Sequence, residues 1–282
     1  LDTVHNYRNA FRNIVLSAPH GLPNGKSLAV THHGYGNVFV DVTVNNVVLK
    51  PKQDNANYTL FKWNDHATGV QILRSRLGNN ISLVGIQPTQ LNLRFIELAG
   101  GCSQDMSQNN TGMYAVRNTV VGNLDLTSMA SQSTSFRGIK ISCSKYNEAP
   151  FGYFVANNTF TNISADTVTI MELNAPQYLQ FKIINTNNIL GPFNATQVIG
   201  TTSNAPTEVS YSNFLSVTQK TDGKALLGPG NLSVDPLFVD PDNGDFNLQA
   251  GSQCIESGNP VLTNPDGTTS DMGAFGGPLA TW

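Results

Sequence analysis

Four residues that lie close together in the sequence could bind a carbohydrate. They are Lys62, Trp63, Asp65 and His66. An aromatic ring beside a carboxylate and an imidazole can stack on a sugar ring and hydrogen-bond its hydroxyl groups. This group predicts a substrate-binding patch on a loop. The alternative interpretation is a cluster at the rim of a loop that only packs over the protein core.

Basic residues form a second group, spread further along the chain. Arg76, Arg117 and Lys140 lie on or beside successive units of the repeat described below. If those units stack, the three cations could form a basic strip along one face of the stack. The alternative is that they occupy ordinary outward-facing positions of half-exposed strands.

Two further groups predict little chemistry. His32 and His33 are adjacent, so on a strand they point to opposite faces and only one could serve a groove. Asp240 to Asp245 alternates carboxylates as calcium loops do, but Gly244 departs from the EF-hand pattern and Gly251 stands where a bidentate Glu is required. We therefore predict a turn there, no metal site and no cofactor, with calcium kept as the alternative.

Composition excludes several classes of partner. Charged residues make up 12% of the 282-residue chain, against roughly 25% in typical soluble domains. With a formal net charge of -3, the chain has no basic field to attract nucleic acid. It has no 18-residue apolar stretch, so we predict no membrane span. Cys102, Cys143 and Cys254 are odd in number and allow at most one disulfide, whose pairing stays open.

An asparagine-marked repeat organises the middle of the chain. Apolar residues alternate up to an asparagine and continue beyond it, and steps of 34, 38, 40, 30 and 25 residues separate Asn46, Asn80, Asn118, Asn158, Asn188 and Asn213. Asparagine tolerates the left-handed backbone of a sharp bend, and stacked amides can hydrogen-bond to one another. The steps predict stacked coils of β-structure. A β-propeller would show a steadier period and a sandwich would show regular hairpin turns.

The ends of the chain differ from this repeat. Within residues 1–26, Val4, Tyr7, Phe11 and Ile14 follow a helical spacing, which predicts a short amphipathic helix that caps the stack, with an irregular strand as the alternative. We expect one structural domain with coils over residues 27–232. Residues 233–282 are expected to form a closing coil and tail.

The C-terminal segment carries a recognisable pattern. It begins with Ser233-Val-Asp-Pro-Leu-Phe238, continues through an Asn-Gly turn, and ends with Asp271-Met-Gly-Ala-Phe-Gly-Gly277. Over residues 233–277, and together with the asparagine-marked repeats, it resembles the last coil of the secreted right-handed parallel β-helix proteins of the pectate-lyase-like superfamily. The resemblance implies an all-β fold, a single-stranded right-handed parallel β-helix (solenoid) with irregular projecting loops, and a secreted, extracellular protein.

The same resemblance implies a polysaccharide or cell-surface glycan as the partner, bound in a groove along the coils. A lyase of this fold would use a Lys or Arg to remove the proton beside a uronate carboxylate, so Arg76, Arg117 and Lys140 are the candidate catalytic residues. The signatures of polygalacturonase-type hydrolases are absent. Two functions stay open: a polysaccharide-binding protein, with or without β-elimination, and a non-catalytic structural or adhesive protein of a cell surface, sheath or filament that associates end to end.

Overall fold

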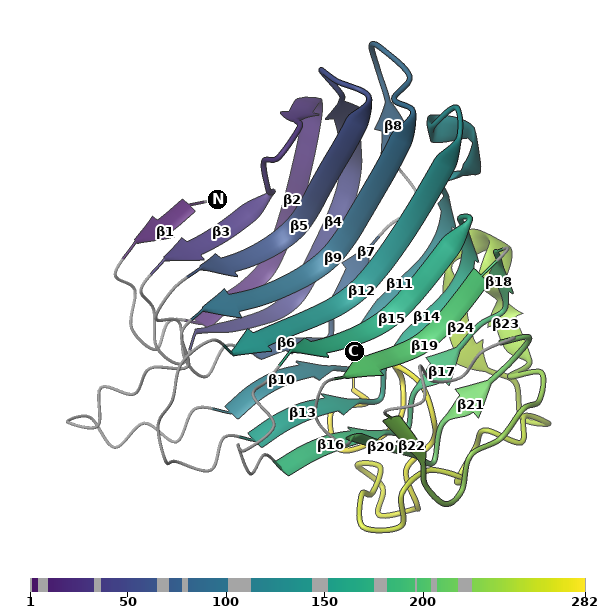
Figure 1. Ribbon diagram of the computed structural model, residues 1–282. Coiled ribbons are helices and arrows are strands. Elements are labelled where there is room, and N and C mark those ends of the chain that lie inside the picture. Colours follow the sequence, from purple (N-terminus) through teal and green to yellow (C-terminus); the bar gives the residue numbers. More distant parts are fainter. Residues whose placement is uncertain are drawn as a thin grey trace.

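Parallel β-strands make up nearly all the regular structure of the computed structural model, which describes residues 2–4, 10–32, 37–64, 71–77, 81–100, 113–143, 152–174, 182–195, 197–203, 207–217 and 225–281. One sheet has seven parallel strands, which follow one another across the front of Figure 1. In spatial order they are β1 (Asp2–Val4), β3 (Ala29–His32), β5 (Asn55–Asn64), β9 (Gln90–Gly100), β12 (Ser133–Cys143), β15 (Thr167–Asn174) and β19 (Gln197–Ser203).

A second sheet of fifteen strands runs behind and below the first in Figure 1. Its strands are β2 (Ala10–Pro23), β4 (Val38–Lys50), β6 (Gln71–Leu73), β7 (Arg76–Leu77), β8 (Ile81–Leu83), β10 (Met113–Arg117), β11 (Val120–Asp125), β13 (Gly152–Ala156), β14 (Thr159–Ser164), β16 (Lys182–Thr186), β17 (Ile189–Leu190), β18 (Phe193–Asn194), β20 (Thr207–Ser210), β21 (Asn213–Phe214) and β22 (Ala225–Leu227). The chain alternates between the two sheets and advances one rung on each return, as from β9 through β10 and β11 to β12. This winding makes the fold an all-β parallel β-helix, as predicted.

Apolar side chains fill the space inside the coils. Phe61 and Phe95, which are both fully buried, meet edge to face with ring centroids 5.6 Å apart. Phe136 and Phe160 continue the same buried cluster into the next coils. No helix in the described ranges is long and apolar enough to cross a membrane.

The helix expected near the N-terminus is wrong for the described part of that segment. Ala10–Pro23 forms β2, which pairs in parallel with β4 along its length, with two irregularities in register. Phe11 stacks on Phe39 with ring centroids 4.8 Å apart, whereas Val15 is 65% exposed. Short helices are marginal without tertiary support, and here the backbone gains a full ladder of strand pairing instead.

A sharp corner recurs at the same place in successive coils. The corner residues have positive φ angles between 47° and 59°, and the strand registers align them in the series Asn13, Asp41, Arg74, Asn118, Asn157, Asn187 and Tyr211. Four of the seven are asparagines. Asparagine is among the few residues that tolerate this left-handed conformation readily.

The residue after each corner joins one coil to the next. The backbone N–H of Thr119 donates to Asn158 Oδ1, that of Asn158 to Asn188 Oδ1, that of Asn188 to Ser212 Oγ, and that of Ser212 to Asn231 Oδ1, at 2.9–3.1 Å. These pairs are 39, 30, 24 and 19 residues apart in sequence, so the coils shorten toward the C-terminus. We call this series of bonds the corner ladder.

The asparagines that marked the repeat belong to two corners rather than one. Asn46 has a φ of 52° at a second corner, where Asn162 Nδ2 donates to Asn123 Oδ1 at 3.0 Å. Asn118 lies at the first corner, whereas Asn158 and Asn188 belong to the ladder beside it. Asn213 lies in register with Ile189, one residue beyond the ladder, and Asn80 lies outside the described residues.

The C-terminal segment follows the outside of the stack instead of adding a parallel strand to it. The strands β23 (Phe238–Asp240) and β24 (Asp245–Leu248) form an antiparallel hairpin. Between them Asp240 accepts a bond from the backbone N–H of Asn243, and Gly244 has a φ of 83°, so the acidic hexad is a turn, as predicted.

Residues 249–281, which we call the tail, cross the first of these corners, the one that contains Asn118, Asn157 and Asn187. Asn187 Nδ2 donates to Ser270 Oγ at 2.8 Å, Asn157 Nδ2 to the carbonyl of Asp271 at 3.0 Å and Asn118 Nδ2 to that of Ala274 at 2.8 Å. Arg74 Nη1 donates to the carbonyl of Thr281 at 2.9 Å. The tail therefore spans four coils and is held by the residues that turn them. A smaller apolar cluster fills the space between the coils and the C-terminal segment, which comprises the hairpin and the tail. It includes Val120, Ile189, Phe246, Cys254 and Met272.

Asn158→Ala is expected to lower the free energy of unfolding by about 2–4 kcal/mol, because each buried group that loses its partner costs about 1–3 kcal/mol. The side chain of Asn158 accepts from Thr119 N–H and donates to the carbonyl of Val116 and to Asn188 Oδ1. Urea unfolding measures the change. The matched control is Asn247→Ala, an exposed residue of β24 whose side chain, among the described residues, bonds to Asp245 two positions away. Equal effects of the two substitutions would contradict a structural role for the ladder.

Tyr58→Phe is expected to stabilise the protein by about 1 kcal/mol, because an unsatisfied buried hydroxyl costs free energy. Tyr58 is 2% exposed, and its hydroxyl has no hydrogen-bond partner in the described part of the chain. Burial raises the pKa of Tyr58 from 10.0 to about 12. Folding therefore favours the neutral phenol over the phenolate. Ionisation of Tyr58 does not lower the free energy of unfolding below pH 10, but it lowers that free energy as the pH rises from 10 toward 12. Unfolding curves from pH 9 to 12 should fall less steeply for the variant, and parallel curves would contradict the prediction.

Candidate functional site

The predicted carbohydrate patch is described only in part. Lys62 and Trp63 lie on β5, where their registers pair them with Glu97 and Leu98 of β9. Lys62 is half-buried. Asp65 and His66 lie outside the described residues, so the patch as a whole stays a prediction.

The basic strip is not brought together. Arg76 and Arg117 belong to β7 and β10 of the fifteen-stranded sheet, whereas Lys140 belongs to β12 of the seven-stranded sheet. The Arg76 guanidinium lies 5.5 Å from the ring centroid of Phe275 in the tail. Burial lowers the pKa of both arginines, an effect that Asp245 opposes at Arg76. Lys140 is thus the one candidate of the three on the sheet that also carries Lys62.

Lys140 occupies a row of alternating charge. The strand registers place Lys62, Glu97, Lys140 and Glu172 side by side on β5, β9, β12 and β15. Adjacent strands of a sheet lie about 4.8 Å apart. Each charge in the row therefore has an opposite charge on the next strand, which is favourable for cross-strand pairs.

A second row lies three residues earlier on the same strands. It contains Thr59, Arg94, Arg137 and Thr169. Strict alternation would place residues three apart on opposite faces. Between the rows, however, each strand buries two consecutive residues: Leu60 and Phe61, Phe95 and Ile96, Gly138 and Ile139, Ile170 and Met171. This shared irregularity brings the charged residues of both rows to the outer face, whereas Thr169 at the end of the second row is buried.

Gly138 is required at this irregularity. A Cβ atom there would lie 2.4 Å from the backbone carbonyl oxygen of Ile170 on the next strand. A contact so short needs a shift of the backbone. The glycine therefore lets β12 follow its neighbours through the irregularity between Arg137 and Lys140.

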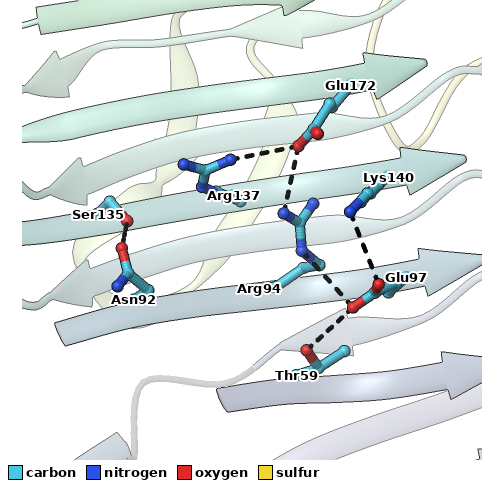
Figure 2. Close-up of polar contacts among 8 residues, drawn as sticks. All are labelled: Thr59, Asn92, Arg94, Glu97, Ser135, Arg137, Lys140 and Glu172. Carbon is cyan, nitrogen blue, oxygen red and sulfur yellow. Dashed lines mark hydrogen bonds and ion pairs between the residues drawn. The ribbon is translucent and has the colours of Figure 1, made fainter. Parts of the chain in front are cut away.

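Ion pairs join the two rows into one network, shown in Figure 2. Glu172 Oε2 accepts from Arg94 Nη2 at 3.2 Å and from Arg137 Nη1 at 3.3 Å. Glu97 lies 3.9 Å from Arg94 Nε and 3.8 Å from Lys140 Nζ. Arg94 thus bridges the two glutamates. We call these five residues the charged network.

The network contains more positive than negative charge. Its three cations face two carboxylates, and Lys62 is in register beside Glu97. The Arg94 side chain is only 12% exposed, whereas that of Arg137 is 42% exposed. Burial lowers the pKa of Arg94, and the carboxylates of Glu172 and Glu97 oppose this shift. The glutamates therefore compensate the burial of Arg94 and fix its orientation, while Arg137 is accessible to a ligand.

Amide and hydroxyl groups adjoin the network. Asn92 Oδ1 accepts a close hydrogen bond from Ser135 Oγ, and Asn57 Nδ2 donates to Asn55 Oδ1 at 3.1 Å. These groups and the network border an open groove of about 280 Å³, lined by Asn57, Tyr58, Thr59, Asn92, Leu93, Arg94, Glu97 and Arg137. The groove presents hydrogen-bonding amides at one end and guanidinium groups at the other.

A sequence signal for the network exists but is weak. Four segments share one pattern, with a polar or charged residue, two core positions and a charged residue: Thr59–Lys62, Arg94–Glu97, Arg137–Lys140 and Thr169–Glu172. Aligning them one per coil would have found the network. The asparagine repeat does not suggest that alignment, because it marks corners of the other sheet.

Comparison with known proteins gives no further guide. No family model, no curated protein and no solved structure matches the chain significantly. Among the described residues, no group of three or more histidines, cysteines, aspartates or glutamates is placed to hold a metal ion.

Glu172→Ala is expected to destabilise the protein by about 1–3 kcal/mol, because it removes the carboxylate that accepts from the largely buried guanidinium of Arg94. Thermal and urea unfolding measure the loss. Glu208→Ala, at an exposed glutamate, is the matched control and should change stability little. A Glu172 variant as stable as the control would show that the network does not depend on this carboxylate.

Proposed function

We propose that the protein binds an extracellular acidic polysaccharide along the outer face of the seven-stranded sheet. The observation that carries the proposal is the convergence of Arg94 and Arg137 with the amides of Asn57 and Asn92 at one open groove, beside which Lys140 pairs with the groove residue Glu97. Arginine pairs with carboxylates and sulfates through two parallel hydrogen bonds, and asparagine amides can donate to and accept from sugar hydroxyls.

The repetition of the rows supports an extended ligand. Each of β5, β9 and β12 carries at least one cation, so a chain that crosses these strands meets a positive charge at each rung. A small ligand would need only one such rung. The polar row containing Asn57, Asn92 and Ser135 runs parallel to the charged rows. A polymer with both hydroxyl and acidic groups matches the two kinds of row.

Cleavage by β-elimination is the finer part of the proposal. The reaction needs a base that removes the proton beside the uronate carboxylate, while a cation balances the charge of that carboxylate. Lys140 is the candidate base at this face, and Arg94 and Arg137 are the candidate partners of the carboxylate. With the Lys140 ammonium 3.8 Å from Glu97, the lysine would have to lose its proton before it acted.

Affinity electrophoresis through gels that contain pectate, alginate or chondroitin sulfate tests the binding. Arg137→Ala and Lys140→Ala should each weaken retention by roughly tenfold, because one charge-assisted hydrogen bond contributes about 1.5 kcal/mol or more. Retention should also fall with added salt. Arg12→Ala and Lys52→Ala remove exposed cations elsewhere and should have no effect.

Two results would contradict the proposal. The unaltered protein could pass all three gels without delay, or the control variants could lose as much affinity as the groove variants. Absorbance of the unsaturated product measures cleavage in the same samples. Its loss in Lys140→Ala but not in Lys52→Ala would assign the base to Lys140.

A further inference from the structure

The asparagines that could accept an N-linked glycan fall into two structural groups. The chain contains seven Asn-x-Ser/Thr sequons, and the asparagines of five lie within the described residues: Asn57, Asn157, Asn162, Asn194 and Asn231. A chain so rich in Asn, Ser and Thr produces such sequons by chance, so their number alone carries no argument. Their surroundings differ sharply.

Two of these asparagines are needed by the fold. Asn157 is fully buried, and its Nδ2 donates to Ser270 Oγ at 3.1 Å and to the carbonyl of Asp271 at 3.0 Å. Asn231 ends the described corner ladder, and its Nδ2 donates to the carbonyls of Val209 and Gly228 at 2.9 and 3.0 Å. In both, the amide nitrogen uses its two hydrogens within the protein.

A glycan at either position conflicts with this arrangement. N-glycosylation joins Nδ2 to the anomeric carbon of a sugar, releases the lipid pyrophosphate that carried the oligosaccharide, and removes one proton from the amide. One donor is therefore lost, and a bulky saccharide takes its place. At Asn157 it would have to occupy the space filled by the tail. Asn162 is an intermediate case, half-buried with one bond from Nδ2 to Asn123 Oδ1.

Asn194 and Asn57 have the opposite character. Asn194 is the last residue of β18, and it holds its place in the stack through its backbone, because its carbonyl accepts from Ala165 N–H at 3.0 Å. Its side chain is exposed. Asn57 is also exposed, but it lines the groove between the amide row and the charged network.

We propose that Asn194 and Asn57 are positions at which this fold accepts an N-linked glycan, and that modification of Asn157 or Asn231 is incompatible with the folded state. A glycan on Asn57 would lie in the groove and exclude a polysaccharide. This last point rests on the proposed function, whereas the assignment of sites does not.

The test is to secrete the full chain from a eukaryotic host whose oligosaccharyltransferase modifies nascent chains. The protease-resistant, monodisperse fraction is separated from the aggregated fraction, and each is treated with peptide N-glycosidase in ¹⁸O-labelled water before peptide mapping by mass spectrometry. Asn194 and Asn57 should be labelled in the folded fraction. Label at Asn157 and Asn231 should be confined to the aggregated fraction.

Two variants check the assignment independently of Asn itself. Thr196→Ala removes the Asn194 sequon and should lower the mass by one glycan without reducing the yield. Ser233→Ala removes the Asn231 sequon and should raise the yield of folded protein, because Ser233 is exposed and contributes one bond to the carbonyl of Phe214. A glycan on Asn157 or Asn231 in folded protein, or an unmodified Asn194 or Asn57 there, overturns the proposal.

The groove is tested by comparing two preparations of the chain. Folded protein that carries the Asn57 glycan and the same chain produced in a host without an oligosaccharyltransferase are run through pectate, alginate and chondroitin sulfate gels. Retention of the unmodified form alone supports exclusion by the Asn57 glycan, and equal retention of both forms overturns it. If neither form is retained, the proposed function fails, while the site assignment is still decided by the peptide map.

Discussion

The buried hydrogen bonds of the corner ladder set the positions of the coils. At each sharp corner the backbone leaves the strand pairing, and a buried N–H there needs another acceptor. The side chain of the equivalent residue in the next coil supplies it, as Asn188 does for Asn158 and Asn231 does for Ser212. Because the acceptor belongs to the next coil, every bond also fixes the separation and register of two coils.

This constraint is independent of coil length. The bonded residues are 39 apart in sequence in one pair and 19 apart in another, yet the ladder geometry is the same. Long connections can leave the stack without disturbing it, which agrees with the tolerance of surface loops for insertion. The same corner positions the tail, since Asn118, Asn157 and Asn187 direct their amides outward to the chain that crosses them.

The sequence was sufficient for the fold but not for the register. Alternating apolar residues and recurring asparagines indicated stacked coils, because both follow from the local requirements of strands and corners. Asn46 and Asn118 were placed in one series although they turn different corners, since unequal coil lengths hide which corner an asparagine occupies. The helix predicted from the spacing of Phe11 and Ile14 was wrong for a related reason, because local spacing does not show pairing with a distant strand. Pairing of β2 with β4 depends on residues some 30 positions away.

The usual alternation of side chains between the two faces of a strand could not have predicted the candidate site. Arg94 and Glu97 are three residues apart, so an ideal strand would place them on opposite faces. The double burial of Phe95 and Ile96 reverses that expectation, and the neighbouring strands repeat it in register. The opposite difficulty affected the predicted basic strip, whose residues were expected to lie together but lie on different sheets. The similar charge and coil-sized spacing of Arg76, Arg117 and Lys140 do not indicate which sheet each residue belongs to.

The shared irregularity also explains why a charged network can exist on a chain with so few charges. It brings two rows to one face, so that Arg94 lies within 4 Å of a carboxylate on its own strand and of another on β15. The glutamates compensate the burial of Arg94, which would otherwise be costly. The ion pairs hold the cations in place, which would lower the cost of ordering long side chains if the proposed polysaccharide binds here. A groove of this kind needs few charged residues, provided that the corner ladder keeps the strands in register.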